Sequence, residues 1–476
     1  MDQERLPSPH VLIFPLPLQG PVNSMLKLAE LLCLAGLRVT FLNTHHNHRR
    51  HIRFSDMAAR LEQYPSLRFA TISDGLSEDH PRCGPRIMEM FESLEAATKP
   101  HFRELLVSGG FTCVIAELVM GFPLDVCEEV GVPVFCFDTI SPICLWVYAC
   151  IPRLIEAGEL PFRGNNMDEL VTNVAGMEGI LRRRDLPHFC RAADLYDPHY
   201  NVVSTEIRKI RRSQGLILNT FEELDGPTLS NLRSLSPNTY AVGPLHRHLK
   251  ARHAGASQSS NSVWKEDRSC MAWLDAQPEE SVIYVSIRSV SMMTNDEVME
   301  LWHGLVNSGK RFLWVRRPNS IVSGCGEDQV PSVLLEATKE RGCMVSWAPQ
   351  EEVLAHPAIG GFLTHSGWNS TIESIVEGLP MVCWAYHIDQ LVNSRFVGEV
   401  WRLGMDMKDR CDRATVEKMV RDVMEERRNE FKKSADRMAM LARASVDEEG
   451  SSFCDFNRLV DDIRLMVAGK ANAKLS

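Results

Sequence analysis

Residues 347–390 read WAPQEEVLAHPAIGGFLTHSGWNSTIESIVEGLPMVCWAYHIDQ, and this stretch decides the fold of the C-terminal half. The apolar run GGFLT predicts a buried strand, THSGWNS predicts the turn that follows it, and a helix is expected to open at Trp368. The run MVCWAY then predicts the next strand. This order of elements is typical of a parallel sheet with right-handed crossovers.

Polar side chains gather at the end of the first of these strands. A helix that begins there points the backbone N–H groups around Gly367 to Ser370 at whatever precedes it, which suits a diphosphate. Asn369 and Ser370 add side-chain donors, and His365 can add another. Trp347 offers a flat apolar face for a base. The segment therefore indicates a site for a nucleotide.

Two further polar residues end the same stretch. Asp389 and Gln390 follow a strand and a turn, and such paired polar groups suit several sugar hydroxyls. A plainer interpretation makes Trp347 and Trp368 core aromatics and the polar residues after Gly367 ordinary helix caps. That interpretation fits each fragment alone but not the whole string.

The same alternation of strands and helices continues outward from this stretch. SVIYVSI, RFLWVRR and CMVSWAP predict three more strands in the C-terminal half, with a helix near residues 295–308. In the first half HVLIFPL, LRVTFLN, CVIAEL and PVFCFD predict strands, with helices over about residues 22–34 and ending near Val130. The sequence predicts an α/β fold of two Rossmann-like doubly wound domains facing across a cleft.

Length and composition divide the chain further. A chain of 476 residues exceeds the roughly 250 to 300 residues that one core serves. Residues 246–266 are polar and rich in Ser, Gly and Ala, so they are expected to form a linker. We expect an N-terminal domain over residues 1–245, a C-terminal domain over 267–450, and a closing helix and tail over 451–476.

Charge and hydropathy exclude several classes of protein. The formal net charge of −10 gives no reason to expect nucleic acid as a partner. Apolar runs are too short or too interrupted for a membrane span, and the amino terminus lacks the pattern of a signal peptide. We therefore expect a cytoplasmic protein, monomeric, with small molecules as partners.

The 44-residue string at 347–390 resembles the signature box of the plant family 1 UDP-glycosyltransferases, and the similarity extends over essentially the whole chain. The resemblance implies the GT-B fold, with the acceptor bound mainly by the first domain and the donor by the second. It also implies UDP-glucose as co-substrate, no prosthetic group and no metal site.

Carried over position by position, the resemblance assigns the donor-binding residues. Trp347 would stack on uracil, with the Ala348 backbone pairing with that base, while Gln350 and Glu373 would hold the ribose. The diphosphate would lie against the turn that contains His365, Gly367, Trp368, Asn369 and Ser370. The sugar would contact Thr139, Asp389 and Gln390, and Ser289 matches a loop residue that touches the phosphates.

The chain departs from the family at three positions that carry chemistry. Pro21 stands where the family has the His that takes the proton of the acceptor hydroxyl, and proline cannot accept a proton. Glu117 falls in the segment where the family has the Asp that orients that His. Arg288 stands where the family commonly has Gly beside the diphosphate, so it could either bind the phosphates or fill their space.

These departures leave three hypotheses for the reaction. Loss of a general base typically costs about 10² to 10⁴ in rate. A carboxylic acid acceptor, with a pKa of about 4, is already ionised at pH 7 and needs no base. Alternatively Glu117 reaches the acceptor and serves as acid or base. In the third hypothesis the protein has lost sugar transfer and binds or converts a small metabolite by another reaction, as a lyase, isomerase or cyclase.

Other residues are weighed against plainer alternatives. The candidates for the acceptor-pocket wall are Met120, Phe122, Trp146, Tyr148 and, as a cleft-facing histidine, His387; ordinary core packing is the alternative. The cluster THHNHRRH at residues 44–51 is expected to be a solvated loop or pocket rim rather than a metal site. The triplet at residues 182–184 is expected to be a solvated basic face. The sequence thus predicts an inverting UDP-glucose-dependent glycosyltransferase that acts on a small plant specialised metabolite with a nonstandard or absent base.

Overall fold

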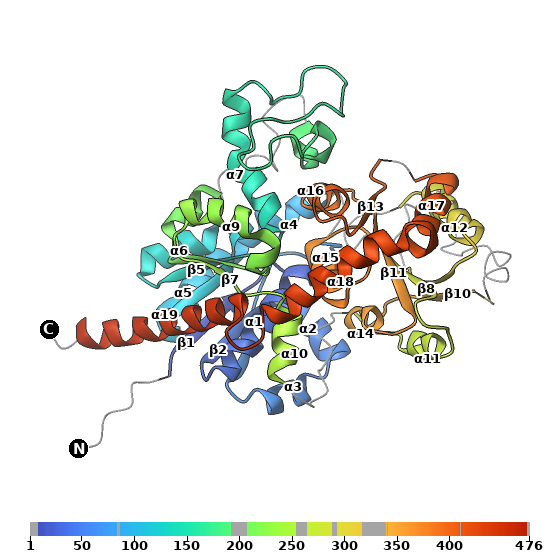
Figure 1. Ribbon diagram of the computed structural model, residues 1–476. Coiled ribbons are helices and arrows are strands. Elements are labelled where there is room, and N and C mark those ends of the chain that lie inside the picture. Colours follow the sequence, from blue (N-terminus) through green and yellow to red (C-terminus); the bar gives the residue numbers. More distant parts are fainter. Residues whose placement is uncertain are drawn as a thin grey trace. The chain divides into compact units, whose positions relative to one another are not determined.

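The computed structural model describes residues 8–82, 86–191, 207–253, 264–287, 293–316, 339, 341–409 and 411–473 (Figure 1). The chain divides into two compact units. The first unit comprises Met1–Ala149, Pro198–Trp264 and Arg443–Ser476, and the second comprises Cys150–Asp197 and Lys265–Ala442. The chain therefore passes into the second unit after residue 149 and returns to the first unit at residue 198. It enters the second unit again at residue 265 and ends in the first unit from residue 443.

The first unit is built on a parallel sheet. Within the described residues its seven strands are hydrogen-bonded in the order β3 (Leu67–Ile72), β2 (Arg38–Thr44), β1 (His10–Phe14), β4 (Cys113–Glu117), β5 (Val134–Asp138), β6 (Gly215–Leu218) and β7 (Thr239–Ala241). The chain winds outward from β1 in one direction and from β4 in the other. The switch in direction lies between β1 and β4, where Phe14 pairs with Ala116.

Helices cover both faces of this sheet because successive side chains of a strand point to opposite faces. Val11 and Ile13 of β1 join a cluster with α1 (Gln19–Leu34), α10 (Leu245–Arg252) and α19 (Ser451–Ala473). Leu12 and Phe14 join a cluster on the other face, with α5 (Lys99–Gly109), α6 (Phe122–Val130) and α9 (Glu222–Leu235). The remaining helices are α2 (His45–Phe54), α3 (Met57–Gln63), α4 (Ile87–Ser93) and α7 (Pro142–Glu156), of which α7 leads into the second unit.

The second unit repeats the plan with a smaller sheet. Within the described residues its six parallel strands follow the order β10 (Gly342–Val345), β9 (Arg311–Val315), β8 (Val282–Ser286), β11 (Ile359–Thr364), β12 (Met381–Cys383) and β13 (Gly404–Asp406). Its helices are α11 (Ser269–Asp275), α12 (Asn295–Asn307), α14 (Gln350–Leu354), α15 (Trp368–Glu377), α16 (Gln390–Arg395), α17 (Arg413–Arg421) and α18 (Arg428–Ala444). The switch in strand order lies between β8 and β11, where Ser286 pairs with Thr364.

The predicted class, two Rossmann-like doubly wound sheets, is confirmed by these strand orders. The predicted helices near residues 295–308 and from Trp368 are present as α12 and α15. The helix predicted from about residue 22 begins earlier, at Gln19, because Pro21 fits the first turn of a helix.

The boundaries of the units differ from the predicted domains in two places. The segment expected as a linker begins with a helix, α10, whose Leu245 and Leu249 are buried in the first unit. Residues 150–197, expected in the first domain, belong to the second unit. The closing helix α19 belongs to the first unit, where Phe456, Leu459 and Ile463 enter the core beside α1. Among the described residues, no helix combines the length and apolarity needed to cross a bilayer.

Candidate functional site

The turn between β11 and α15 carries the centre of the site in the second unit. It lies at the switch point of the sheet, where α/β folds bind ligands. Ser366 takes a left-handed conformation with φ of 62°, and its N–H donates to Thr364 Oγ1 at 3.1 Å. Gly367 is the N-cap of α15 and supplies no capping side chain, so the start of the helix is lined by backbone N–H groups, as at helix termini that bind anions. The Trp368 N–H donates to the Asp389 carboxylate.

Gly367 is required by the packing of His365. A Cβ atom added to Gly367 would lie 2.5 Å from His365 Nε2, which is closer than such atoms approach. The φ of Gly367 is −61°, an ordinary value, so contact with the ring is the reason for glycine. The absence of a side chain thus lets the imidazole lie directly on the turn that precedes α15.

Three residues predicted to hold the nucleotide are joined by hydrogen bonds. Gln350 Nε2 donates to Glu373 Oε2 at 2.7 Å and to Ser370 Oγ at 3.0 Å. Tyr284, from β8, donates to Gln350 Oε1 at 3.5 Å. The start of α14 and the first two turns of α15 are thereby held together, with Glu373 and Ser370 both buried.

The base-binding candidates lie just before α14. Trp347 is half-buried and Ala348 is buried. The Trp347 carbonyl accepts a hydrogen bond from the Asp267 N–H at 2.8 Å, which fixes the backbone at this position. Trp368, in contrast, is 2% exposed and packs near Trp401, so its side chain serves the core, as the plainer interpretation had it.

Asp389 and Gln390 lie at the start of α16. The Gln390 carbonyl oxygen Oε1 accepts hydrogen bonds from the N–H groups of Tyr386 and His387, both at 3.1 Å. Asp389 Oδ2 accepts from Asn393 Nδ2 at 2.9 Å. Burial raises the pKa of Asp389 to about 7, because the hydrogen bonds to its carboxylate only partly offset the loss of water.

Asn393 also ties α16 to the turn before α15. Its Nδ2 donates to the Ser366 carbonyl at 2.9 Å as well as to Asp389. Asp389 and Gln390 are therefore brought together with the turn before α15 within the second unit, whereas Thr139, the third predicted sugar contact, belongs to the first unit. Arg288 and Ser289 lie outside the described residues, just beyond the end of β8.

The first unit holds a second set of polar residues at its own switch point. Glu117 ends β4 and is 2% exposed. Its Oε2 accepts from the Val119 N–H at 2.9 Å, and its Oε1 accepts from Thr139 Oγ1 at 3.1 Å. Pro21 lies in the first turn of α1, which follows the neighbouring strand β1. Glu117 and Thr139 are thus brought together as a buried and oriented pair.

The acceptor-pocket candidates are mostly buried. Met120 and Phe122 belong to a hydrophobic core cluster, Trp146 packs against it, and Tyr148 is 6% exposed. Their role in an acceptor pocket stays a prediction. His387 lies in the second unit, where its ring is 5.2 Å from that of His188.

The histidine-rich segment was expected to be a solvated loop or a pocket rim, and the loop is wrong, whereas the pocket rim stays a prediction. Thr44 caps α2 by accepting from the Asn47 N–H, so a helix begins at His45. His51 is fully buried, and Asn43 lies 3.1 Å from its Nδ1. Among the described residues, no group of three or more His, Cys, Asp or Glu side chains is placed to hold a metal ion.

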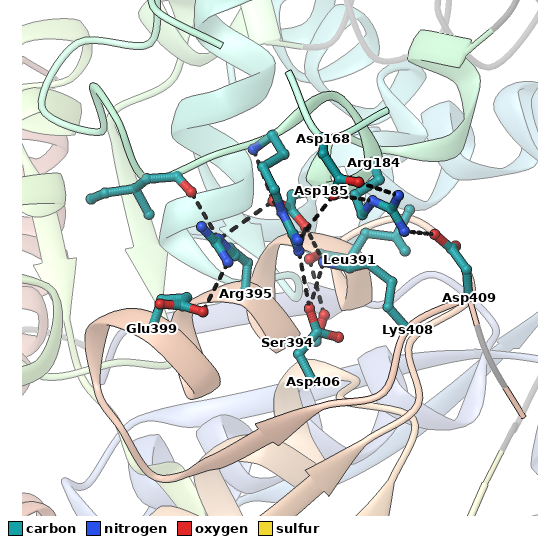
Figure 2. A network of polar contacts seen from close by, with 12 residues as sticks. Asp168, Arg184, Asp185, Leu391, Ser394, Arg395, Glu399, Asp406, Lys408 and Asp409 are labelled. Atoms are coloured by element: carbon teal, nitrogen blue, oxygen red, sulfur yellow. Dashed lines mark hydrogen bonds and ion pairs between the residues drawn. The ribbon is translucent and has the colours of Figure 1, made fainter. Parts of the chain in front are cut away.

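The basic triplet at residues 182–184 was expected to face solvent, and the structure corrects this. Figure 2 shows Arg184 in a network with Asp168, Asp185, residues of α16 and the loop after β13. Arg182 Nε lies 2.9 Å from Asp185 Oδ2, and Arg184 bridges Asp168 and Asp409. Charge and composition do not reveal this role, because Asp409 is 225 residues from Arg184 and the pairing with the nearer Asp168 and Asp185 depends on the fold.

The known proteins that resemble this chain in sequence and in structure agree with one another. The family model described as "UDP-glucoronosyl and UDP-glucosyl transferase" matches residues 237–444. A 7-deoxyloganetic acid glucosyltransferase of Catharanthus roseus is 52% identical, covering 98% of this chain and 99% of that protein. A myricetin 3-O-rhamnoside 1,2-glucosyltransferase of Crocosmia x crocosmiiflora is 43% identical, covering 96% of each. The crystal structure of Os79 from O. sativa in complex with UDP aligns with a TM-score of 0.80 at 27% identity, covering 95% of this chain and all of that one.

Proposed function

This chain belongs to the plant UDP-glycosyltransferases, and from that premise we propose that it transfers glucose from UDP-glucose to a small plant metabolite that carries a carboxyl group. The enzyme class is glycosyl transfer from a UDP-sugar, and the family needs no prosthetic group. We place the reaction in the cytoplasm.

The donor half of the proposal rests on the hydrogen-bonded set in the second unit. Trp347 and the Ala348 backbone bind the uracil, and Gln350 and Glu373 bind the ribose. The N–H groups at the start of α15 and the His365 ring bind the diphosphate, so the helix terminus stabilises the negative charge that develops on the departing UDP.

The side chains of Asn369 and Ser370 add donors to the same diphosphate. Asp389 and Gln390 hold the glucose, with Thr139 contributing from its strand end. Ser289 and Arg288 lie outside the described residues, so their assignment to the phosphates stays a prediction, with Arg288 either binding the phosphates or filling their space.

The acceptor half rests on one observation, which is that Pro21 occupies the first turn of α1. We infer that this is the position of the family's base. A carboxylate needs no base, because it is ionised at neutral pH. One of its oxygens forms a bond to the anomeric carbon from the side opposite the diphosphate. The bond between that carbon and the UDP oxygen breaks, and UDP leaves with the electron pair. No proton moves in this step, and the configuration inverts.

The named substrate of a close relative supports this choice. The Catharanthus roseus enzyme carries the name of 7-deoxyloganetic acid, a carboxylic acid, and is 52% identical over nearly all of both chains. For a hydroxyl acceptor the base is instead Glu117, whose carboxylate is held in place by Thr139 and the Val119 N–H. Catalysis by that route needs the acceptor hydroxyl within roughly 3 Å of the carboxylate.

The test uses a matched pair of acceptors, a small lipophilic carboxylic acid and the corresponding primary alcohol, each with UDP-glucose and the purified chain. We expect UDP release with the acid and a glucose ester, which hydroxylamine converts to the hydroxamate. Glucosylation of the alcohol alone would contradict the acidic acceptor and support the Glu117 route. Binding of UDP without turnover of either acceptor would contradict sugar transfer itself.

A further inference from the structure

Helix α16 follows Asp389 and begins with Gln390, the residues proposed to hold the sugar, and it is anchored at two points. In its second half Asn393 ties it to the Ser366 carbonyl, on the turn proposed for the diphosphate. At its end Arg395 Nε donates to the Ile180 carbonyl at 2.8 Å and lies 3.5 Å from Asp185 Oδ2. The second anchor therefore comes from the segment of residues 180–185, which belongs to the second unit and follows α7 in the chain.

Asp185 is the centre of that second anchor. Its side chain is fully buried and meets three cations, namely Lys408, Arg182 and Arg395 (Figure 2). Arg182 also donates its own backbone N–H to Asp185 Oδ2 at 2.8 Å, which closes the short turn η4 (Arg183–Asp185). Lys408 is 4% exposed and lies 2.8 Å from Asp406 Oδ2, at the end of β13.

The opposite charges in this cluster stabilise one another's ionised forms. Burial alone would raise the pKa of Asp185, but hydrogen bonds and charge from Arg182 and Lys408 outweigh it and lower that pKa. A buried ion pair of this kind gives little net stability compared with an apolar contact, yet loss of one partner leaves an uncompensated charge. Such clusters therefore fix geometry more than they add stability.

We propose that Ile180 and Asp185 form a positioning element for the donor sugar, in which both act through Arg395 to set the place of α16 and hence of Asp389 and Gln390. This rests on the proposed function, which assigns those two residues to the glucose. The element leaves the nucleotide contacts alone, because Trp347, Gln350 and Glu373 lie on α14, α15 and the segment before them.

Arg395 suits the role because its guanidinium has several donors in a fixed plane. It contacts the Ile180 carbonyl, Asp185 and, at 3.0 Å, Glu399, so it fixes the direction of the helix end as well as its distance. A lysine at this position keeps the charge but cannot hold all three partners in one plane. The change from Arg to Lys therefore loosens α16 without leaving Asp185 uncompensated.

The experiment compares Arg395→Lys with a matched control, Arg184→Lys. Arg184 belongs to the same network but bridges Asp168 and Asp409, and within the described residues no hydrogen bond or ion pair joins its side chain to α16. For each full-length variant, calorimetry gives the Kd of UDP and of UDP-glucose, thermal unfolding gives Tm, and UDP release gives kcat/KM with UDP-glucose and with UDP-galactose.

For Arg395→Lys we expect kcat/KM with UDP-glucose to fall about tenfold, because a small displacement of a positioned group has a large effect on rate. The preference for UDP-glucose over UDP-galactose should narrow, while the Kd of UDP stays within about twofold of wild type, because the proposed uracil and ribose contacts lie on elements other than α16 and Asn393 keeps its bond to Ser366. The control should keep all of these values.

Two results would overturn the positioning role: a parallel loss of UDP and UDP-glucose binding in Arg395→Lys, or unchanged sugar preference and rate. Equal effects in Arg184→Lys would do the same, since a general loosening of the segment would then explain them. If the wild-type chain binds UDP but neither binds nor uses UDP-glucose, the proposed function fails first, and that outcome is visible before any variant is made.

Discussion

The first sheet switches direction between β1 and β4, beside Pro21 and Glu117, whereas the second switches between β8 and β11, beside the turn from His365 to Ser370. The two positions are equivalent in topology but differ in how their chemistry is distributed. Under the proposed function, donor binding in the second unit is shared among backbone N–H groups and several side chains. In the first unit, proton removal would rest on a single position, which Pro21 occupies.

This difference indicates that a binding site shared among many groups and a catalytic task assigned to one residue can change independently of each other. Pro21 fits the first helical turn as well as a histidine would, so the fold gives no resistance to the replacement. Removal of a member of the donor set, in contrast, leaves buried polar partners behind, as at Gln350, Ser370 and Glu373.

The largest expected effect comes from restoring a base in the first unit. Pro21→His should raise kcat with a hydroxyl acceptor by about 10² or more, because general base catalysis typically contributes 10² to 10⁴. The rate with a carboxylic acid acceptor should not change, since that acceptor has no proton to lose. Initial rates of UDP release with the two acceptors make the measurement, and Pro21→Ala is the control for loss of the proline alone. Equal gains with both acceptors would contradict the carboxylate route.

A smaller effect is expected from breaking the packing of the donor turn. Gly367→Ala should push the His365 ring aside and weaken UDP binding about tenfold, or about 1.4 kcal/mol, with little change in Tm. Calorimetric titration with UDP provides the measurement. His365→Ala is the matched background. Without the imidazole, the Gly367→Ala change should weaken UDP binding much less. Additive losses in the double variant would show that the ring is not the cause.

The smallest effect concerns the protonation of Asp389. Its pKa is raised to about 7, so the carboxylate form becomes dominant only as pH rises through that value. Sugar hydroxyls donate hydrogen bonds best to the carboxylate, so the affinity for UDP-glucose relative to UDP should rise by about threefold from pH 6 to pH 8. The ratio of the two Kd values, measured across this range, removes any effect of the diphosphate. Asp389→Asn should flatten the ratio, and a slope that survives in this variant would assign the titration to another group.

Much of the fold was predictable because local patterns agree with the tertiary structure. The β1 strand and the α12 and α15 helices follow the apolar runs and caps in the sequence, and the residues of the donor turn were found because they form one continuous string. The predicted loop at residues 44–51 failed because the Thr44 cap outweighs the low helix propensity of its four histidines. The role of Asp185 could not be predicted, since its partners Arg395 and Lys408 are distant in sequence and come together only in the folded chain.

The interleaving of the two units has a practical consequence for chimeric enzymes. An exchange of residues 1–245 between relatives, intended to replace the acceptor-binding half, also replaces residues 150–197, which belong to the second unit. Lys408 and Arg395 of the recipient would then pair with residue 185 of the other enzyme. Helix α19 of the recipient would pack its Phe456 and Leu459 onto the α1 of the other enzyme. Exchanges with junctions at residues 149, 198, 264 and 443 keep each core whole. We expect such exchanges to transfer the acceptor range while the surface proposed to bind the UDP-sugar stays intact.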